Sequence, residues 1–228
     1  MSPKLNWNIG TPPSSEQELL RRCCSIEGMT VSELSQAIGK NVPCDMRHAK
    51  GYVGQLLEKA LGASAGSASI PDFPGLGIEL KSIPVDHDHK PRESTFVCHV
   101  SLASIGEEEW ETCALKSKLQ CVLWIPVQGS REIPLPHRRI GTAVLWRLSG
   151  KQEATLREDW EELAGRIGRG EAELITGHMG NVLQLRPKGV NAQAHSWAID
   201  EDGGLRRSGM RAFYLRSAFT HSILRGEE

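Results

Sequence analysis

A run in the first third of the chain places two acids and a lysine at fixed spacing around a strand. It reads Pro71-Asp72-Phe73-Pro74-Gly75-Leu76-Gly77-Ile78-Glu79-Leu80-Lys81. Apolar residues across 78–85 predict a strand, and the two-residue period of a strand puts Glu79 and Lys81 on the face opposite Ile78. The fold must therefore place an acid and a base side by side on one strand.

Asp72 stands at the near end of a turn that contains proline and glycine, so its carboxylate can swing back beside Glu79. Hard divalent ions such as Mg²⁺ are held by one or two carboxylates together with phosphate oxygens of a substrate. Lys81 would stabilise charge that develops on phosphorus. The run thus predicts a metal-dependent phosphodiesterase site. The competing interpretation is a solvated strand edge that carries a Glu and a Lys.

Composition favours an ordinary globular protein with one domain over residues 1–228, since 39% of the residues are hydrophobic and 24% are charged. The sequence has no apolar run of about eighteen residues, and its first residues are polar and rich in proline. We therefore expect neither a membrane span nor an export signal. The protein should stay in the cytoplasm.

The cysteines and histidines do not form a recognisable metal-binding motif. Six cysteines occur without a Cys-x-x-Cys pair, and several lie in apolar stretches, which favours buried thiols over disulfides or zinc ligands. His87 and His89 are chemically able to bind a metal. A short polar run between two strands nevertheless predicts a solvated loop over 86–90.

A net charge of −1 excludes general binding to polyanions, so any contact with nucleic acid must come from a local patch. Residues 182–225 carry seven basic side chains against three acidic ones, a balance of +4. This segment is the predicted patch.

Helix signals dominate the first sixty residues. Ser15-x-x-Glu18 and Thr30-x-x-Glu33 are typical of capping boxes, and each opens a run with helical apolar spacing. A third helix is expected over 51–61, with Glu58 beside its buried stripe.

Strands and helices alternate in the rest of the chain. We expect strands at 78–85, 95–100, 122–127, 143–148, 181–185 and 211–215, and helices at 155–167, at 191–199 and at the end of the chain. This mixture predicts one α/β or α+β domain whose sheet underlies a cleft.

Several segments recur together in one known family. They are Lys50-Gly51-Tyr52-Val53-Gly54, Leu61-Gly62-Ala63-Ser64-Ala65-Gly66-Ser67, Gly77-Ile78-Glu79-Leu80-Lys81-Ser82-Ile83-Pro84-Val85, Val122-Leu123-Trp124-Ile125-Pro126-Val127 and Leu185-Arg186-Pro187-Lys188. With them the sequence resembles the MutH family, the strand-discriminating endonucleases of bacterial methyl-directed mismatch repair. The resemblance runs from about residue 15 to about residue 220.

The resemblance implies a restriction-endonuclease-like fold, in which helices flank a central mixed sheet and two lobes clamp a DNA-binding cleft. It implies double-stranded DNA containing GATC as the substrate, nicked on the unmethylated strand of hemimethylated sites. It also implies Mg²⁺ as cofactor, with Mn²⁺ or Ca²⁺ able to take the same site, and the MutL ATPase as activator. The chain length favours a monomer.

The family's functional residues can be carried over to matching positions. The resemblance implies five catalytic side chains: Asp72, Glu79, Lys81, Glu58 and Lys118. Asp72 and Glu79 would bind the metal, with the backbone carbonyl of Leu80 as a further ligand. Glu58 would come from the preceding helix, and Lys118 from the segment before the strand at 122–127.

Matching positions also imply DNA contacts, at Lys50, Gly51, Phe96, Arg186, Pro187, Lys188 and Tyr214. A good bidentate contact in the major groove distinguishes bases by about 1–3 kcal/mol, and the adenine methyl group lies in that groove. Tyr214 and Arg186 are the candidates for sensing the methyl group. Without the resemblance, the apolar neighbours of Tyr214 would predict a core residue.

Two other functions are compatible with the same residues. A GATC-specific restriction endonuclease would make double-strand breaks, and would have to dimerise or act twice. A non-catalytic GATC-binding module would use the acids only to tune the charge of the cleft. The intact set of Asp72, Glu79 and Lys81 favours an enzyme over that module.

Overall fold

A computed structural model of the chain describes residues 5–43, 51–66, 70–188 and 195–227. The chain divides into two compact units. The first comprises Met1–Arg92 and Gln120–Arg147, and the second comprises Glu93–Leu119 and Leu148–Glu228. Neither unit is continuous in sequence, because the chain returns to the first unit after residue 119.

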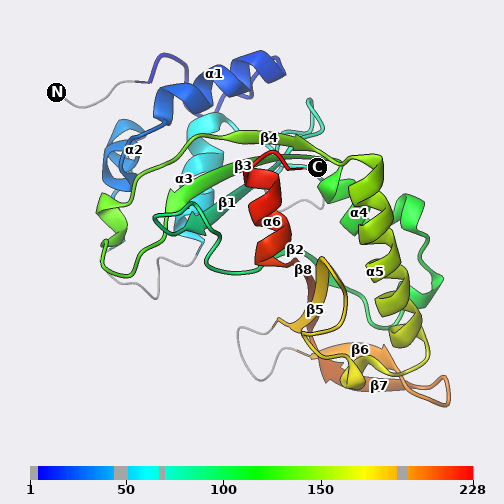
Figure 1. The fold of residues 1–228 in the computed structure, drawn as a ribbon. Coiled ribbons are helices and arrows are strands. Elements are labelled where there is room, and N and C mark those ends of the chain that lie inside the picture. The colour runs from blue at the N-terminus through cyan, green and yellow to red at the C-terminus, as the bar shows by residue number, and fades with distance from the viewer. Residues whose placement is uncertain (1–4, 44–50, 67–69, 189–194, 228) are drawn as a thin grey trace. The chain divides into compact units, whose positions relative to one another are not determined.

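The first unit combines helices with a mixed sheet (Figure 1). Its elements are α1 (Glu16–Ile26), α2 (Val31–Ala37), α3 (Tyr52–Leu61), β1 (Glu79–Val85), β3 (Cys121–Gln128), the 3₁₀ turn η3 (Leu135–His137) and β4 (Val144–Arg147). The strand order is β1-β3-β4, with β1 parallel and β4 antiparallel to β3.

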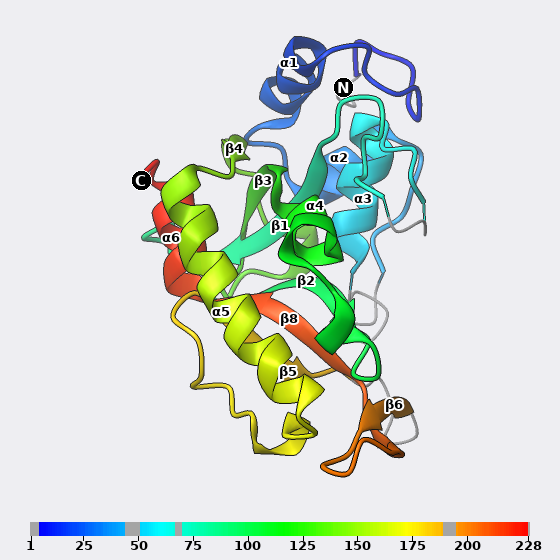
Figure 2. The same ribbon diagram turned by 90° about the vertical axis from the view of Figure 1, so that its right-hand side faces the viewer.

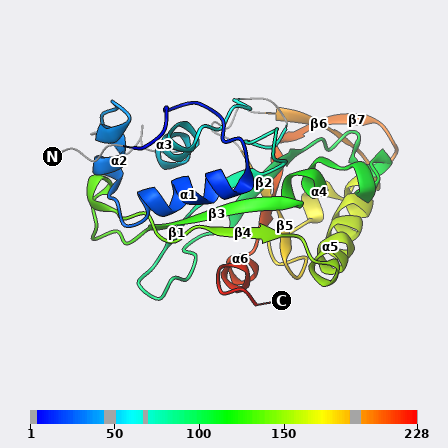
Figure 3. The same ribbon diagram turned by 90° about the horizontal axis from the view of Figure 1, so that it is seen from above.

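Helices α1, α2 and α3 lie on one side of this sheet (Figure 3). Leu80 of β1 and Leu123 of β3 are in register and face the helices. They join Leu19, Leu34 and Leu57, one from each helix, in the hydrophobic core of the unit. Burial of this apolar surface is the main force that holds the helices to the sheet.

Strand β1 is buried on both faces. Ile83 and Val85 lie on the face opposite Leu80, and they are only 1% and 4% exposed. Burial on both faces is typical of parallel strands. As the two-residue period predicted, Glu79 and Lys81 lie on the face opposite Leu80. That face is buried rather than exposed to solvent.

The two predicted helix caps differ in the structure. At α2, Thr30 Oγ1 accepts the N–H of Glu33 at 3.1 Å, and the Glu33 carboxylate accepts the N–H of Thr30 at 2.7 Å, which confirms a capping box. At α1, Ser15 accepts the N–H of Glu18, but the Glu18 carboxylate binds Ser14 instead. The reciprocal half of that box was wrong.

Glu18 turns to Ser14 because that residue offers two donors, its N–H at 2.7 Å and its hydroxyl at 2.6 Å. The second carboxylate oxygen of Glu18 accepts from the Arg22 guanidinium at 2.5 Å. These bonds, that of the Ser14 hydroxyl first, lower the pKa of Glu18 to about 2.

Arg22 connects three segments of the first unit. Its side chain is buried, and one terminal nitrogen donates to the carbonyl oxygens of Thr11 at 2.6 Å and Leu61 at 2.8 Å. Its other terminal nitrogen forms the ion pair with Glu18. A cation is thereby fixed at the carboxyl end of α3, where the helix dipole favours it.

The end of α3 is closed by further contacts. The indole N–H of Trp7 donates to the carbonyl of Ala60 at 2.8 Å. Gly62 caps the helix with φ +87°, and a Cβ at this position would lie 2.1 Å from the carbonyl oxygen of Thr11. Only glycine fits there. The helix that carries Glu58 therefore has a fixed end point.

The second unit has a separate antiparallel sheet in the order β2-β8-β5. Helix α5 runs along it (Figure 2). The unit contains β2 (Thr95–Val100), η1 (Ile105–Glu107), η2 (Trp110–Thr112), α4 (Ala114–Leu119), α5 (Gly150–Gly168), η4 (Ala172–Leu174), β5 (Leu183–Pro187), β6 (His195–Ile199), β7 (Leu205–Gly209), β8 (Arg211–Leu215) and α6 (Ser217–Leu224).

The helix predicted over 191–199 was wrong where the structure describes it. Residues 195–199 form β6, which pairs antiparallel with β7, while 191–194 lie outside the described residues. Burial alternates along β6, since Ala198 is fully buried and Trp197 is 56% exposed. Strand geometry satisfies that alternation, and the acidic Gly-Gly turn after Ile199 closes a hairpin.

The remaining predictions of class are confirmed. The fold is mixed α+β, with mixed and antiparallel sheets and helices packed against them. The five described cysteines form no disulfide with one another and four of them are buried, whereas Cys44 lies outside the described residues. Among the helices that the structure describes, none is long and apolar enough to cross a membrane.

Candidate active site

A closed turn carries Asp72 back to strand β1. Phe73 and Ile78 exchange backbone hydrogen bonds, at 2.9 Å from the Phe73 N–H and 3.3 Å from the Ile78 N–H. Asp72 Oδ2 then accepts the N–H of Leu80 at 2.7 Å. Because the N–H and C=O of one strand residue point to the same side, the Leu80 carbonyl points to the same edge as the Asp72 carboxylate.

Glu79 and Lys81 form an ion pair on β1. The distance from Lys81 Nζ to Glu79 Oε1 is 2.6 Å. The side chain of Lys81 is only 16% exposed, and that of Glu79 only 3%. Parallel pairing sets Glu79 beside Val122 and Lys81 beside Trp124, both of them buried. The solvated-edge interpretation is therefore wrong, and the pair interacts in surroundings that screen charge less than water does.

Glu58 belongs to the same group of charges. It lies on α3, which packs against β1, and its side chain is half-buried. Burial raises the pKa of Glu58, and the carboxylate of Asp72 raises it further, while the ammonium of Lys81 acts in the opposite direction. A helix, a turn and a strand thus bring Glu58, Asp72, Glu79 and Lys81 into one local field.

The donor set at this edge suits a small hard cation. It offers the carboxylates of Asp72 and Glu79 and the backbone carbonyl of Leu80, all of them oxygen ligands. Mg²⁺ is held in this way, with water and substrate phosphate completing its coordination. The carboxylates of Asp72 and Glu79 raise the pKa of Glu58, so these acids lie close enough to repel one another, and a divalent cation would reduce that repulsion.

A second group of candidate residues lies on the sheet of the second unit. Phe96 of β2 is in register with Tyr214 of β8, and their ring centroids are 5.7 Å apart, edge to face. The Arg186 guanidinium lies 5.4 Å from the Tyr214 ring centroid. The Lys188 ammonium lies 4.1 Å from the centroid of Phe96 and 5.7 Å from that of Tyr214. We call these four side chains the aromatic face.

The aromatic face shows the surroundings of Tyr214. Its neighbours Phe213 and Leu215 point to the buried side of the sheet, whereas Tyr214 is half-buried with two cations over its ring. It is therefore not a simple core residue. Pro187 alternates to the side opposite Arg186, in register with Arg211.

Comparison with known proteins shows the family to which the chain belongs. Residues 61–159 match the family model described as "DNA mismatch repair enzyme MutH". The DNA mismatch repair protein MutH of Shewanella amazonensis is 45% identical over 218 residues, which cover 96% of this chain and 97% of that protein. The protein of the same name from Vibrio cholerae is 49% identical over 212 residues, or 93% and 96% of the two chains. The chain belongs to the MutH family.

Membership identifies the chain as a DNA-binding endonuclease of mismatch repair. The matched residues 61–159 include Asp72, Glu79, Lys81 and Lys118. Lys118 lies on α4 in the second unit and is half-buried. The other four catalytic candidates belong to the first unit. The role of Lys118 therefore stays a prediction, as does the two-lobed cleft.

Two DNA-contact positions of the MutH resemblance lie near the start of α3. Lys50 lies outside the described residues. Gly51 is the N-cap of α3 with φ +80°, a left-handed conformation that favours glycine. Its placement ties this position to the helix that also carries Glu58.

The basic segment 182–225 is not one patch. Arg211 is buried and binds Glu173 at 2.9 Å, while Arg216 donates to the carbonyl of Gly180 at 3.1 Å. These arginines hold the second unit together. Arg186 and Lys188 are the basic side chains of this segment that belong to the aromatic face.

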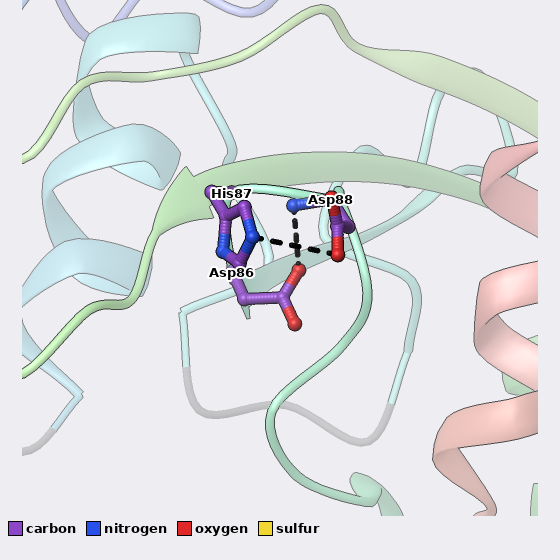
Figure 4. A group of neighbouring side chains, drawn as sticks. All are labelled: Asp86, His87 and Asp88. Carbon is purple, nitrogen blue, oxygen red and sulfur yellow. Dashed lines mark hydrogen bonds and ion pairs between the residues drawn. The ribbon is translucent and has the colours of Figure 1, made fainter.

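The loop after β1 gathers Asp86, His87 and Asp88 (Figure 4). One potential ligand atom from each lies within 4.8 Å of the others. Asp86 Oδ1 already accepts the N–H groups of Asp88 and Lys90, both at 2.9 Å, and these bonds, that of Lys90 first, lower the pKa of Asp86. His87 and Asp88 are exposed, which confirms the predicted solvated loop.

One neighbour of the aromatic face, His99, was not predicted. The imidazole of His99 packs edge to face against Phe96, with ring centroids 5.3 Å apart. Residues three apart on a regular strand lie on opposite faces, so the spacing gave no signal. A shift in the strand register between Phe96 and Cys98 makes the contact.

Replacing Glu58 by Gln should stabilise the protein at neutral pH and not in acid. The pKa of Glu58 is raised above its ordinary value of 4.5, so its ionisation opposes folding. That penalty is absent below pH 4.5 and grows as the pH rises through the folded pKa. Thermal unfolding without divalent ions, at about pH 4 and about pH 8, measures the difference.

Glu132→Gln is the matched control for this change, because Glu132 is an exposed acid of the same unit. Its melting temperature should follow that of the unaltered protein at both pH values. A Glu58→Gln protein that gains no stability at neutral pH would contradict the placement of Glu58 among the other carboxyl groups.

Proposed function

We propose that this endonuclease requires Mg²⁺ and nicks the unmethylated strand at hemimethylated GATC sites. The observation that carries the proposal is the convergence of Asp72, Glu79, Lys81 and Glu58 at one edge of β1. This set holds a metal-binding acid pair and a cation close together, which hydrolysis of a phosphodiester needs.

Asp72, Glu79 and the Leu80 carbonyl would hold the metal. Bound Mg²⁺ supplies Lewis-acid polarisation of the phosphodiester and makes water a better nucleophile at neutral pH. Lys81 offsets negative charge on the phosphoryl oxygens, and Glu79 fixes its ammonium at 2.6 Å. The raised pKa of Glu58 suits this carboxylate to accept the proton that the attacking water loses.

The aromatic face supports the DNA-binding part of the proposal. Arg186 and Lys188 bring positive charge, and Phe96 and Tyr214 hold these cations against their rings. Arg186 and Tyr214 read the edge of the adenine in the major groove, where its methyl group lies. Loss of one such contact costs about 1–3 kcal/mol of discrimination.

We propose further that the MutL ATPase activates the enzyme and that it acts as a monomer. A monomer with one catalytic group cuts one strand in each event, whereas a double-strand break requires two such groups or two successive cuts. Mismatch repair needs a single cut, which leaves the other strand as the template.

A plasmid with one GATC site tests the proposal. Hemimethylated, fully methylated and unmethylated forms are incubated with Mg²⁺, with and without MutL, alongside reactions in EDTA. We expect conversion of supercoiled to open-circular DNA, stimulated by MutL, with the nick on the unmethylated strand and the fully methylated plasmid intact. Linear product from the protein alone would support a restriction endonuclease, and a gel shift without cleavage would support a binding module.

A further inference from the structure

A β-bulge turns His99 towards the aromatic face. Phe96 pairs with Tyr214, Cys98 with Phe213 and His99 with Ala212. The extra residue between Phe96 and Cys98 changes the parity of the strand, so Phe96 and His99 lie on one face although they are three residues apart. Bulges re-aim side chains in this way, often beside functional sites.

The imidazole of His99 is held in position and open to solvent. Its ring packs edge to face on Phe96 at 5.3 Å, and the residue is exposed. Within the described part of the chain, the imidazole interacts with Phe96 alone, and neither ring nitrogen has a hydrogen-bond or ion-pair partner. Both nitrogens are therefore available to a ligand.

Basic side chains come from several elements around β2, and some of them are paired with acids. Lys188 lies over the Phe96 ring on which His99 packs. Strand β8, which pairs with β2, contributes Arg211, which is bound to Glu173. Helix α4, which also packs against β2, contributes Lys116, bound to Glu111 and Glu153, and Lys118. Among the described residues, no acid forms an ion pair or a hydrogen bond with the His99 imidazole, so an anion has no such partner to displace.

We infer that His99 is a further DNA contact, which binds a backbone phosphate through its protonated imidazole. The inference rests on the proposed function and deepens its DNA-binding part. An imidazolium has two N–H donors and no acceptor, which matches a phosphate oxygen rather than a mixed base edge. Because the phosphate stabilises the protonated form, DNA binding takes up a proton at this residue.

The test measures the affinity for a hemimethylated GATC duplex, and for a duplex of the same length without GATC, in EDTA and as a function of salt. Log K falls as log salt rises, and each phosphate that the protein neutralises makes this slope steeper by about 0.9. We compare the unaltered protein, His99→Gln and His99→Lys at about pH 6 and about pH 8, on either side of the titration range of histidine.

At about pH 6 we expect His99→Gln to bind about tenfold more weakly than the unaltered protein, as for loss of one charge-assisted hydrogen bond. Its salt slope should be smaller by about 0.9. At about pH 8 the two proteins should have the same slope. His99→Lys should keep the larger slope at both pH values, because lysine stays charged. A residue that acted only in folding would not be rescued by lysine in this way.

His178→Gln is the control, since His178 is another exposed histidine of the second unit. It should match the unaltered protein throughout. If His99→Gln keeps the full salt slope at about pH 6, or if His99→Lys has the slope of His99→Gln, the inference about His99 is wrong while the proposed function stands. If the unaltered protein shows no preference for GATC DNA, the proposed function itself fails.

Discussion

Asp72→Asn should reduce nicking by about 10³-fold or more, while binding of GATC duplexes remains. In the proposed site the change removes one negative metal ligand, and metal stabilisation of a phosphoryl transition state is worth several kcal/mol. The amide oxygen of asparagine can still accept the N–H of Leu80, a bond of 2.7 Å in the structure. The turn should therefore keep its shape, and the loss should fall on the rate of cleavage.

The measurement is the single-turnover rate of plasmid nicking, with DNA binding and thermal unfolding recorded on the same preparations. Asp88→Asn is the matched control, because Asp88 belongs to the other group of potential metal ligands in the first unit. It should nick at the normal rate. If Asp88→Asn loses activity and Asp72→Asn retains it, the metal site has been placed on the wrong loop.

The arrangement of Asp72, Glu79 and Lys81 around β1 was predictable because its determinants are local. Six residues separate Asp72 from Glu79, and the proline and glycines between them permit the return that the Phe73–Ile78 bridge completes. Strand periodicity alone puts Lys81 beside Glu79. The burial of this pair was not predictable, since it depends on Val122 and Trp124, which lie on β3, far along the chain.

The errors arose where tertiary pairing overrides local pattern. Residues 195–199 contain no helix breaker, yet they are a strand because β7 lies beside them. Strand β7 has a single strongly apolar residue, Leu205, and carries almost no signal of its own. His99 escaped notice for a related reason, because a bulge cannot be read from the spacing of side chains.

The fixed end of α3 was also invisible in the sequence. Arg22 is eleven residues from Thr11 and thirty-nine from Leu61, so neither bond could be anticipated from spacing. An arginine on a helix is usually at the surface, whereas Arg22 is only 4% exposed. Its partners are backbone carbonyls, which every residue possesses, and composition gives no hint of them.

Arg22→Met should destabilise the protein by about 2–5 kcal/mol. Methionine keeps much of the apolar stem but leaves the buried carbonyl of Leu61 without its donor, at about 1–3 kcal/mol, and the partly buried carbonyl of Thr11 as well, at a smaller cost. Removing the arginine Nε, which is buried and lacks a hydrogen-bond partner among the described residues, returns part of this cost. The melting temperature should fall by roughly 2–4 °C for each kcal/mol.

Arg21→Met provides the comparison, because Arg21 is the exposed neighbour on the same helix and its change should stay within about 0.5 kcal/mol. The carbonyl of Leu61 ends the helix that carries Glu58, so Arg22→Met should also slow nicking at temperatures where the protein remains folded. Equal stability of the two variants would mean that Trp7 and Gly62 suffice to close α3. The position of Glu58 would then not depend on the arginine.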